Sequence, residues 1–157
     1  MKFHHTSVIA GDRESLWDFL MDVTNVAACM SDVRNFREIE DDRYEGTLGV
    51  RMGPVRLNFE GVVTVAHRDR ENWRGELLAE AKDRRAGGGF SAHLRMCLDE
   101  ESASATRLAI ELESTVLGKI GEFGQPIVRR RIEKMLDDFS AAVKARVAND
   151  RTGGSAA

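Results

Sequence analysis

The fold is decided by residues 126–148, PIVRRRIEKMLDDFSAAVKARVA. Apolar side chains recur along this stretch at steps of three and four residues, the spacing of one face of an α-helix. These side chains are Ile127, Val128, Ile132, Met135, Leu136, Phe139, Val143 and Val147. A helix from Pro126 to about Ala148 would be about 32 Å long, enough to cross a whole small domain. Its apolar face needs an equally long surface to pack against.

The preceding part of the chain supplies such a surface, because between Val33 and Val116 the apolar residues change to a period of two. The clearest run is Val55, Leu57, Phe59, Gly61, Val63 and Val65, with Arg56, Asn58 and Glu60 between them. Turn residues such as Asp41-Asp42, Gly53-Pro54 and 84–89 separate the runs. This pattern predicts antiparallel strands with one apolar and one solvated face.

The N-terminal residues predict one more strand and two short helices. Lys2–Ile9 is rich in β-branched residues, which favours a strand. Asp12 is a good N-cap for a helix over Arg13–Met21, and Thr24 for a second over Asn25–Met30. The expected class is α+β, with a curved antiparallel sheet wrapped around one long C-terminal helix.

Size and charge limit the function classes. The chain has 157 residues, which predicts a single domain over residues 1–148, and residues 149–157 read as a flexible polar tail. A net charge of −3 argues against a nucleic-acid partner. The sequence has no apolar run of membrane-spanning length and no secretory leader at Met1–Thr6, so we expect a cytoplasmic location.

Catalytic and metal-binding motifs are absent from the sequence. Cys29 and Cys97 lie far apart, and no His-Glu-x-x-His, Cys-x-x-Cys or Gly-x-Ser-x-Gly occurs, so we expect neither a metal nor a catalytic site. The inward strand positions instead mix bulky residues with glycine and alanine, which leaves room for an apolar cavity. The candidate lining residues are Tyr44, Leu57, Phe59, Trp73, Phe90, Met96, Ile127, Met135 and Phe139.

Two segments resemble the CoxG family, the G subunits of carbon monoxide dehydrogenase. Residues 53–63, GPVRLNFEGVV, resemble its "GPV" hairpin, and residues 118–125, GKIGEFGQ, resemble its "GKI" approach to the last helix. Residues 26–30, VAACM, stand at its "ACIPG" stretch, where Ser31-Asp32 replaces Pro-Gly. The resemblance implies the START-like (SRPBCC) helix-grip fold.

The same resemblance implies a non-catalytic accessory role beside a molybdenum-containing carbon monoxide dehydrogenase or related hydroxylase. It also implies a quinone or lipid bound in the cavity, and peripheral contact with the inner face of the cell membrane. Two alternatives stay open. One is a polyketide cyclase or hydrolase on the same fold, with Tyr44 as the inward-facing acid or base. The other is a tether with a filled core that only holds a partner or a membrane.

Overall fold

One antiparallel sheet forms most of the molecule. The structure is a computed structural model and describes residues 1–156. Its strands are β1 (Lys2–Ala10), β2 (Val33–Glu40), β3 (Arg43–Met52), β4 (Val55–Asp69), β5 (Arg74–Asp83), β6 (Gly88–Ser102) and β7 (Ala105–Gly118). The seven strands lie in the order β1-β7-β6-β5-β4-β3-β2, and every neighbouring pair is antiparallel. The strands predicted from the period of two are confirmed.

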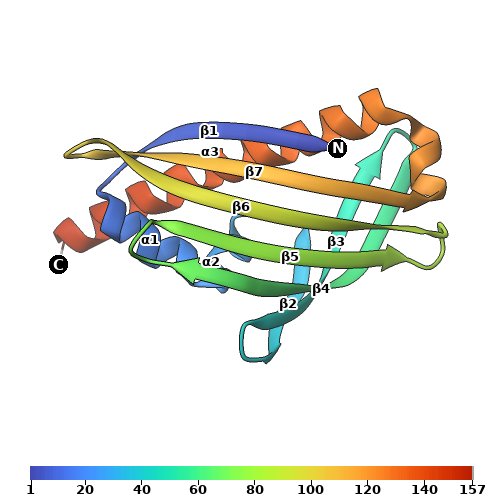
Figure 1. Ribbon diagram of the computed structural model, residues 1–157, viewed down its shortest axis with the longest axis horizontal. Helices are drawn as coiled ribbons and strands as arrows, with labels where there is room; N and C mark the ends of the chain where they lie inside the picture. Colours follow the sequence, from blue (N-terminus) through green and yellow to red (C-terminus); the bar gives the residue numbers. More distant parts are fainter. Residues whose placement is uncertain (157) are drawn as a thin grey trace.

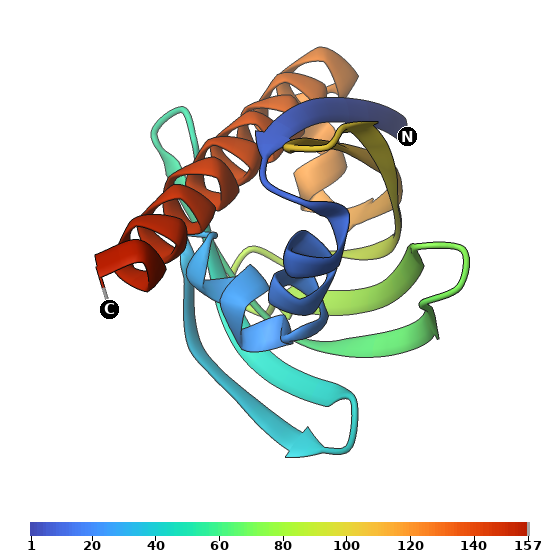
Figure 2. The same cartoon turned by 90° about the vertical axis from the view of Figure 1, so that its left-hand side faces the viewer.

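The described residues also form three α-helices and a short 3-10 helix: α1 (Arg13–Met21), α2 (Val23–Ala28), η1 (Lys119–Phe123) and α3 (Gln125–Ala156). The sheet curves, and α3 runs along its open side (Figures 1 and 2). The two short helices lie at one end of the sheet, the end that faces the viewer in Figure 2. The predicted α+β architecture is therefore confirmed.

Two helices have bounds other than those predicted, and the second spans Val23–Ala28 instead of Asn25–Met30. The second helix begins at Val23 instead of Asn25, because the Asp22 side chain accepts a hydrogen bond from the Thr24 amide and acts as the N-cap. Asp and Thr are both good caps, so composition alone did not choose between them. The long helix continues past Ala148 to Ala156, because its backbone hydrogen bonds need no apolar neighbours. Residues 149–156, which were predicted to belong to a flexible polar tail, are therefore helical.

Two buried clusters hold α3 to the sheet. The larger lies toward the α1 end and joins α1, β1, β6 and β7 to the later turns of α3 through residues such as Trp17, Leu108 and Val143. The smaller joins β3 and β4 to η1 and the first turns of α3 through Leu57 and Val128, among others. The candidate site lies in the space between these two clusters.

Candidate ligand cavity

A cavity of about 370 Å³ lies between the concave face of the sheet and the helices α2 and α3. Strand residues of its wall include Phe59, Phe90 and Met96, and α3 contributes Met135 and Phe139. Its volume falls within the range of small-molecule sites in proteins, and a predominantly apolar lining is typical of such sites. The arrangement suits a hydrophobic ligand held by burial of apolar surface.

Small side chains in the middle of the sheet leave this space open. Ala79 of β5 pairs with Ala92 of β6, and Gly46 of β3 pairs with Gly61 of β4. All four residues line the cavity. A larger side chain at the alanine pair would extend toward α3, so these positions determine how much of the interior stays unfilled. The cavity expected from the mixture of small and bulky residues is present.

The structure brings together only part of the predicted lining set. Five of the nine candidates line the cavity: Phe59, Phe90, Met96, Met135 and Phe139. Four do not, namely Tyr44, Leu57, Trp73 and Ile127. Ligand contact by these five residues remains a prediction.

Tyr44 and Leu57 are buried in packed regions of the protein. The Tyr44 ring stacks on Phe36 with centroids 5.2 Å apart. Leu57 is only 1% exposed and belongs to the smaller buried cluster. Their inward direction was predicted correctly, but neighbouring side chains already fill the space in front of them.

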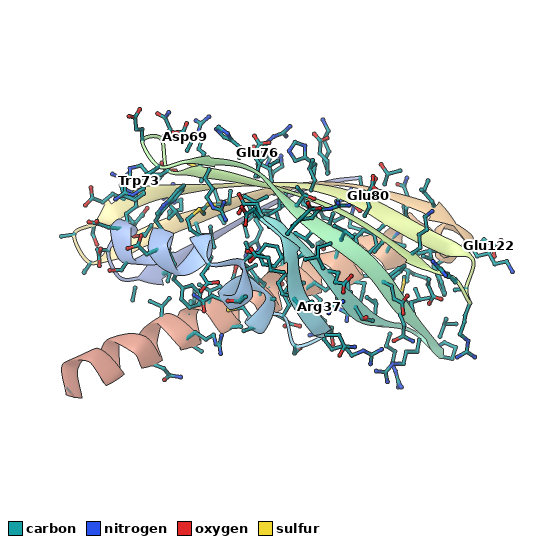
Figure 3. All side chains as sticks on the ribbon, turned by 90° about the horizontal axis from the view of Figure 1, so that it is seen from below. Arg37, Asp69, Trp73, Glu76, Glu80 and Glu122 are labelled. Atoms are coloured by element: carbon teal, nitrogen blue, oxygen red, sulfur yellow. The ribbon has the colours of Figure 1, made fainter. Side chains whose placement is uncertain are left out.

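Trp73 and Ile127 lie outside the cavity for different reasons. Trp73 precedes β5 in a turn with a φ of 58°, so strand alternation does not apply to it. Its ring meets Trp17 of α1 edge to face, with centroids 5.9 Å apart (Figure 3 labels Trp73). Ile127 is 45% exposed on the first turn of α3, where its neighbour Val128 takes the buried position.

Tyr44 is not placed to serve as an acid or base in the cavity. Burial raises the pKa of its hydroxyl, and a hydrogen bond with Glu38 raises that pKa further. The side chain is 7% exposed and is absent from the cavity wall. The cyclase or hydrolase alternative therefore loses the proton-transfer group on which it depended.

Two ion pairs lie at the margins of the cavity, and the sequence pattern did not identify them as part of the site. Arg131 of α3 contacts Asp32 at 3.2 Å, and Arg68 of β4 contacts Asp42 at 2.7 Å; both arginines line the cavity. Arg131 lies three residues after Val128, on the apolar stripe of α3. That spacing could have indicated that Arg131 faces the interior. Its place in a run of three arginines suggested a solvent-facing basic cluster instead.

A serine, a histidine and an aspartate also come together between β1 and α3. His5 Nε2 lies 2.6 Å from Ser140 Oγ, and His5 Nδ1 lies 3.6 Å from Asp137 Oδ1. Sequence reasoning missed this group, because His5 and Ser140 are 135 positions apart. Ser140 is only 4% exposed and does not line the cavity, so its hydroxyl does not face the candidate ligand site. The group ties β1 to α3.

Comparison with known proteins identifies the family. The sequence model of the CoxG family, described as the G subunit of carbon monoxide dehydrogenase, matches residues 6–148. The chain belongs to the CoxG family. A search of curated proteins finds no match for this CoxG-family chain.

Solved structures show the same fold at low sequence identity. A conserved protein from Geobacillus kaustophilus aligns with a TM-score of 0.86 and 19% identity, covering 95% of this chain and 96% of that one. A START superfamily protein from Mycobacterium smegmatis aligns with a TM-score of 0.70 and 13% identity, covering 94% of this chain and 97% of that one. The Zhui aromatase/cyclase from Streptomyces sp. R1128 aligns with a TM-score of 0.64 and 14% identity, covering 93% of this chain and 92% of that one. The CoxG-family chain therefore has the START-like (SRPBCC) fold, which hosts enzymes and other proteins.

Neither a metal centre nor a membrane span is found among the described residues, 1–156. They contain no group of three or more His, Cys, Asp and Glu side chains arranged to hold a metal ion. None of their helices is long and apolar enough to cross a membrane.

Proposed function

We propose that this CoxG-family protein is a non-catalytic accessory protein that carries a hydrophobic molecule, quinone-like or lipid, in the cavity between sheet and α3. The observation that supports this proposal is the apolar cavity of about 370 Å³ in a chain of this family. Carriage requires a pocket that holds its ligand by burial and releases it without a chemical step.

The strength of binding suits reversible carriage. Burying about 300 Å² of apolar ligand surface contributes roughly 7 kcal/mol before the costs of ordering the ligand. That value corresponds to a dissociation constant of about ten micromolar or weaker. A ligand held at this strength exchanges readily with a membrane or with a partner.

The partner in this proposal is a molybdenum-containing carbon monoxide dehydrogenase or a related hydroxylase. The bound hydrophobic molecule links this enzyme to the membrane quinone pool. The family description supports association with the dehydrogenase. The protein would work in the cytoplasm, in peripheral contact with the inner face of the cell membrane. Leu117 and Ile127 are exposed before and after η1, whose first residue is the basic Lys119, and exposed apolar and basic side chains suit contact with anionic lipid.

Titration with a decyl-tailed benzoquinone tests the carriage proposal, together with mass spectrometry of lipids that co-purify with the protein. Ala79→Leu and Ala92→Leu add bulk at the cavity wall and are expected to weaken binding about tenfold. Leu78→Phe adds bulk on the exposed outer side of β5 and serves as the control. Absence of both a co-purifying lipid and quinone binding would contradict carriage.

The same variants separate carriage from tethering. A carrier with a filled cavity loses its ligand and still captures its partner enzyme, but electron transfer from that enzyme to quinone falls. A pure tether keeps both capture and electron transfer when Ala79 or Ala92 is enlarged. Retention of electron transfer in the filled variants would favour the tether.

A further inference from the structure

One margin of the cavity lies between α3 and the turn that joins α2 to β2. Arg131 extends from α3, and Asp32 lies in that turn, 99 positions away in the sequence. Arg131 Nη2 donates a hydrogen bond to Asp32 Oδ2 over 3.2 Å. Met30 and Val33 flank Asp32 in the sequence and both line the cavity, so the ion pair stands at the border of the apolar interior.

The two partners of this ion pair differ in their access to water. The Arg131 side chain is 21% exposed, whereas that of Asp32 is 44% exposed. A guanidinium carries a positive charge and five N–H donors. Asp32 reaches it from the solvated side, where a competing anion can replace it, because partly exposed ion pairs are weak.

Two other charged residues of the cavity wall, Arg68 and Glu76, have a further partner or lie on another side of the sheet. Arg68 contacts Asp42 and also donates a weak hydrogen bond to the Met21 carbonyl. Glu76 is bound by His93 on the next strand, on the side of the sheet away from α3 (Figure 3). Arg131 is thus the cationic side chain of the α3 wall that has a single, half-exposed ion-pair partner.

We propose that the cavity binds amphiphiles with a carboxylate head, and that Arg131 is the residue that recognises this head. The inference rests on the proposed carriage function and concerns its lipid alternative: among single-chain lipids, those with a carboxylate head bind more tightly. The ligand carboxylate takes the place of Asp32 on the guanidinium, and the apolar chain lies in the cavity against Met135. A guanidinium matches a carboxylate in geometry, and hydrogen bonds between two charged groups are the stronger kind.

Dodecanoate and dodecanol test the proposal, because they share a chain and differ only in the head. Each is titrated into the full chain by calorimetry at pH 8, below the concentration at which dodecanoate forms micelles. Wild type is expected to prefer dodecanoate about tenfold. Arg131→Gln removes this preference and leaves dodecanol affinity unchanged, whereas Arg130→Gln, an exposed neighbour on α3, retains the preference.

A second variant tests the same idea from the other side of the ion pair. Asp32→Asn removes the competing anion and keeps the arginine, so dodecanoate affinity is expected to rise about threefold while dodecanol affinity stays constant. The proposal is overturned if wild type binds both probes equally, or if Arg131→Gln keeps the preference; carriage of an apolar chain survives either result. If neither wild type nor any variant binds either probe, this proposal is overturned as well, and the quinone titration alone decides the proposed carriage function.

Discussion

Gly61 of β4 lies so close to Ala81 of β5 that the two strands leave no space for a side chain at position 61. A Cβ atom built on Gly61 would lie 2.5 Å from the Ala81 Cβ and 2.2 Å from the Glu80 carbonyl oxygen. Because the second of these atoms is backbone, no side-chain rotation relieves the clash. The glycine therefore permits the close approach of two strands at the centre of the curved sheet.

The first prediction is that Gly61→Ala destabilises the fold instead of filling the cavity. We expect a loss of about 1–3 kcal/mol in the free energy of unfolding, the cost of overpacking. Gly75→Ala is the matched control: its new Cβ would lie 3.4 Å from the flexible end of Met21, so stability should change by less than about 0.5 kcal/mol. Urea unfolding measures both variants, and equal stability of the two would contradict this account.

A second prediction concerns Trp73, which packs in a turn and not in the cavity. Arg70 stacks over its ring at 3.8 Å from the centroid, and Trp17 meets its edge. Trp73→Leu should lower the free energy of unfolding by about 1–2 kcal/mol through loss of these contacts. Affinity for a decyl-tailed benzoquinone should stay within about twofold.

Phe90→Ala provides the comparison for this prediction, because Phe90 lines the cavity and packs against Phe59 with ring centroids 5.0 Å apart. It is expected to change quinone affinity as well as stability. If Trp73→Leu weakens quinone binding as strongly as Phe90→Ala does, the ligand extends beyond the cavity toward α1.

Much of the fold could be predicted because its signals are local. The alternation of apolar and polar residues from Val55 to Val65 predicted which side of β4 is apolar. Asp12 predicted the start of α1, and its carboxylate accepts a hydrogen bond from the Ser15 amide as the N-cap of that helix. The three- and four-residue steps after Pro126 gave α3 its buried face. These patterns depend on residues close together in the sequence.

The site was less predictable, because it depends on how elements meet. The rotation of α3 against the sheet puts Arg131 at the cavity and Ile127 in solvent. The apolar stripe indicates this rotation only approximately, because Ile127 and Val128 are both apolar and Arg131 is charged. The stacking of Phe36 on Tyr44 joins two strands and closes the space that the tyrosine faces. Period and composition show which side of a strand is apolar, but they do not show whether another side chain already covers it.

The third prediction is that Ser140 is structural and not a nucleophile. Ser140→Ala removes its contact with His5 and should cost about 1 kcal/mol of stability. A serine-reactive fluorophosphonate should leave the wild-type protein unlabelled, because the hydroxyl is buried. Labelling that disappears in Ser140→Ala would show instead that the group between β1 and α3 opens and acts chemically.

The fourth prediction is that Asp83 makes the β5–β6 turn sensitive to acid. Its carboxylate accepts hydrogen bonds from the backbone amides of Asn58 at 2.8 Å, Arg85 at 2.9 Å and Ala86 at 3.0 Å. These bonds, the one from Asn58 foremost, lower the pKa of Asp83 below its ordinary value of 3.8. A lowered pKa in the folded state stabilises the protein above the unfolded-state pKa, and this contribution is lost as the pH falls through the folded-state value.

Asp83→Asn should therefore be destabilising by about 1–2 kcal/mol at neutral pH, because an amide has one acceptor oxygen where the carboxylate uses two. The gap in stability between variant and wild type should narrow as the pH falls from the ordinary value of 3.8 toward the lower folded-state pKa of Asp83, because the carboxyl of the unfolded chain takes up its proton first. Glu100→Gln, at an exposed position of β6, supplies the control and should leave the acid profile unchanged. Unfolding curves across this pH range measure the effect, and a gap of constant size would mean that the three amides do not depend on the charge of Asp83.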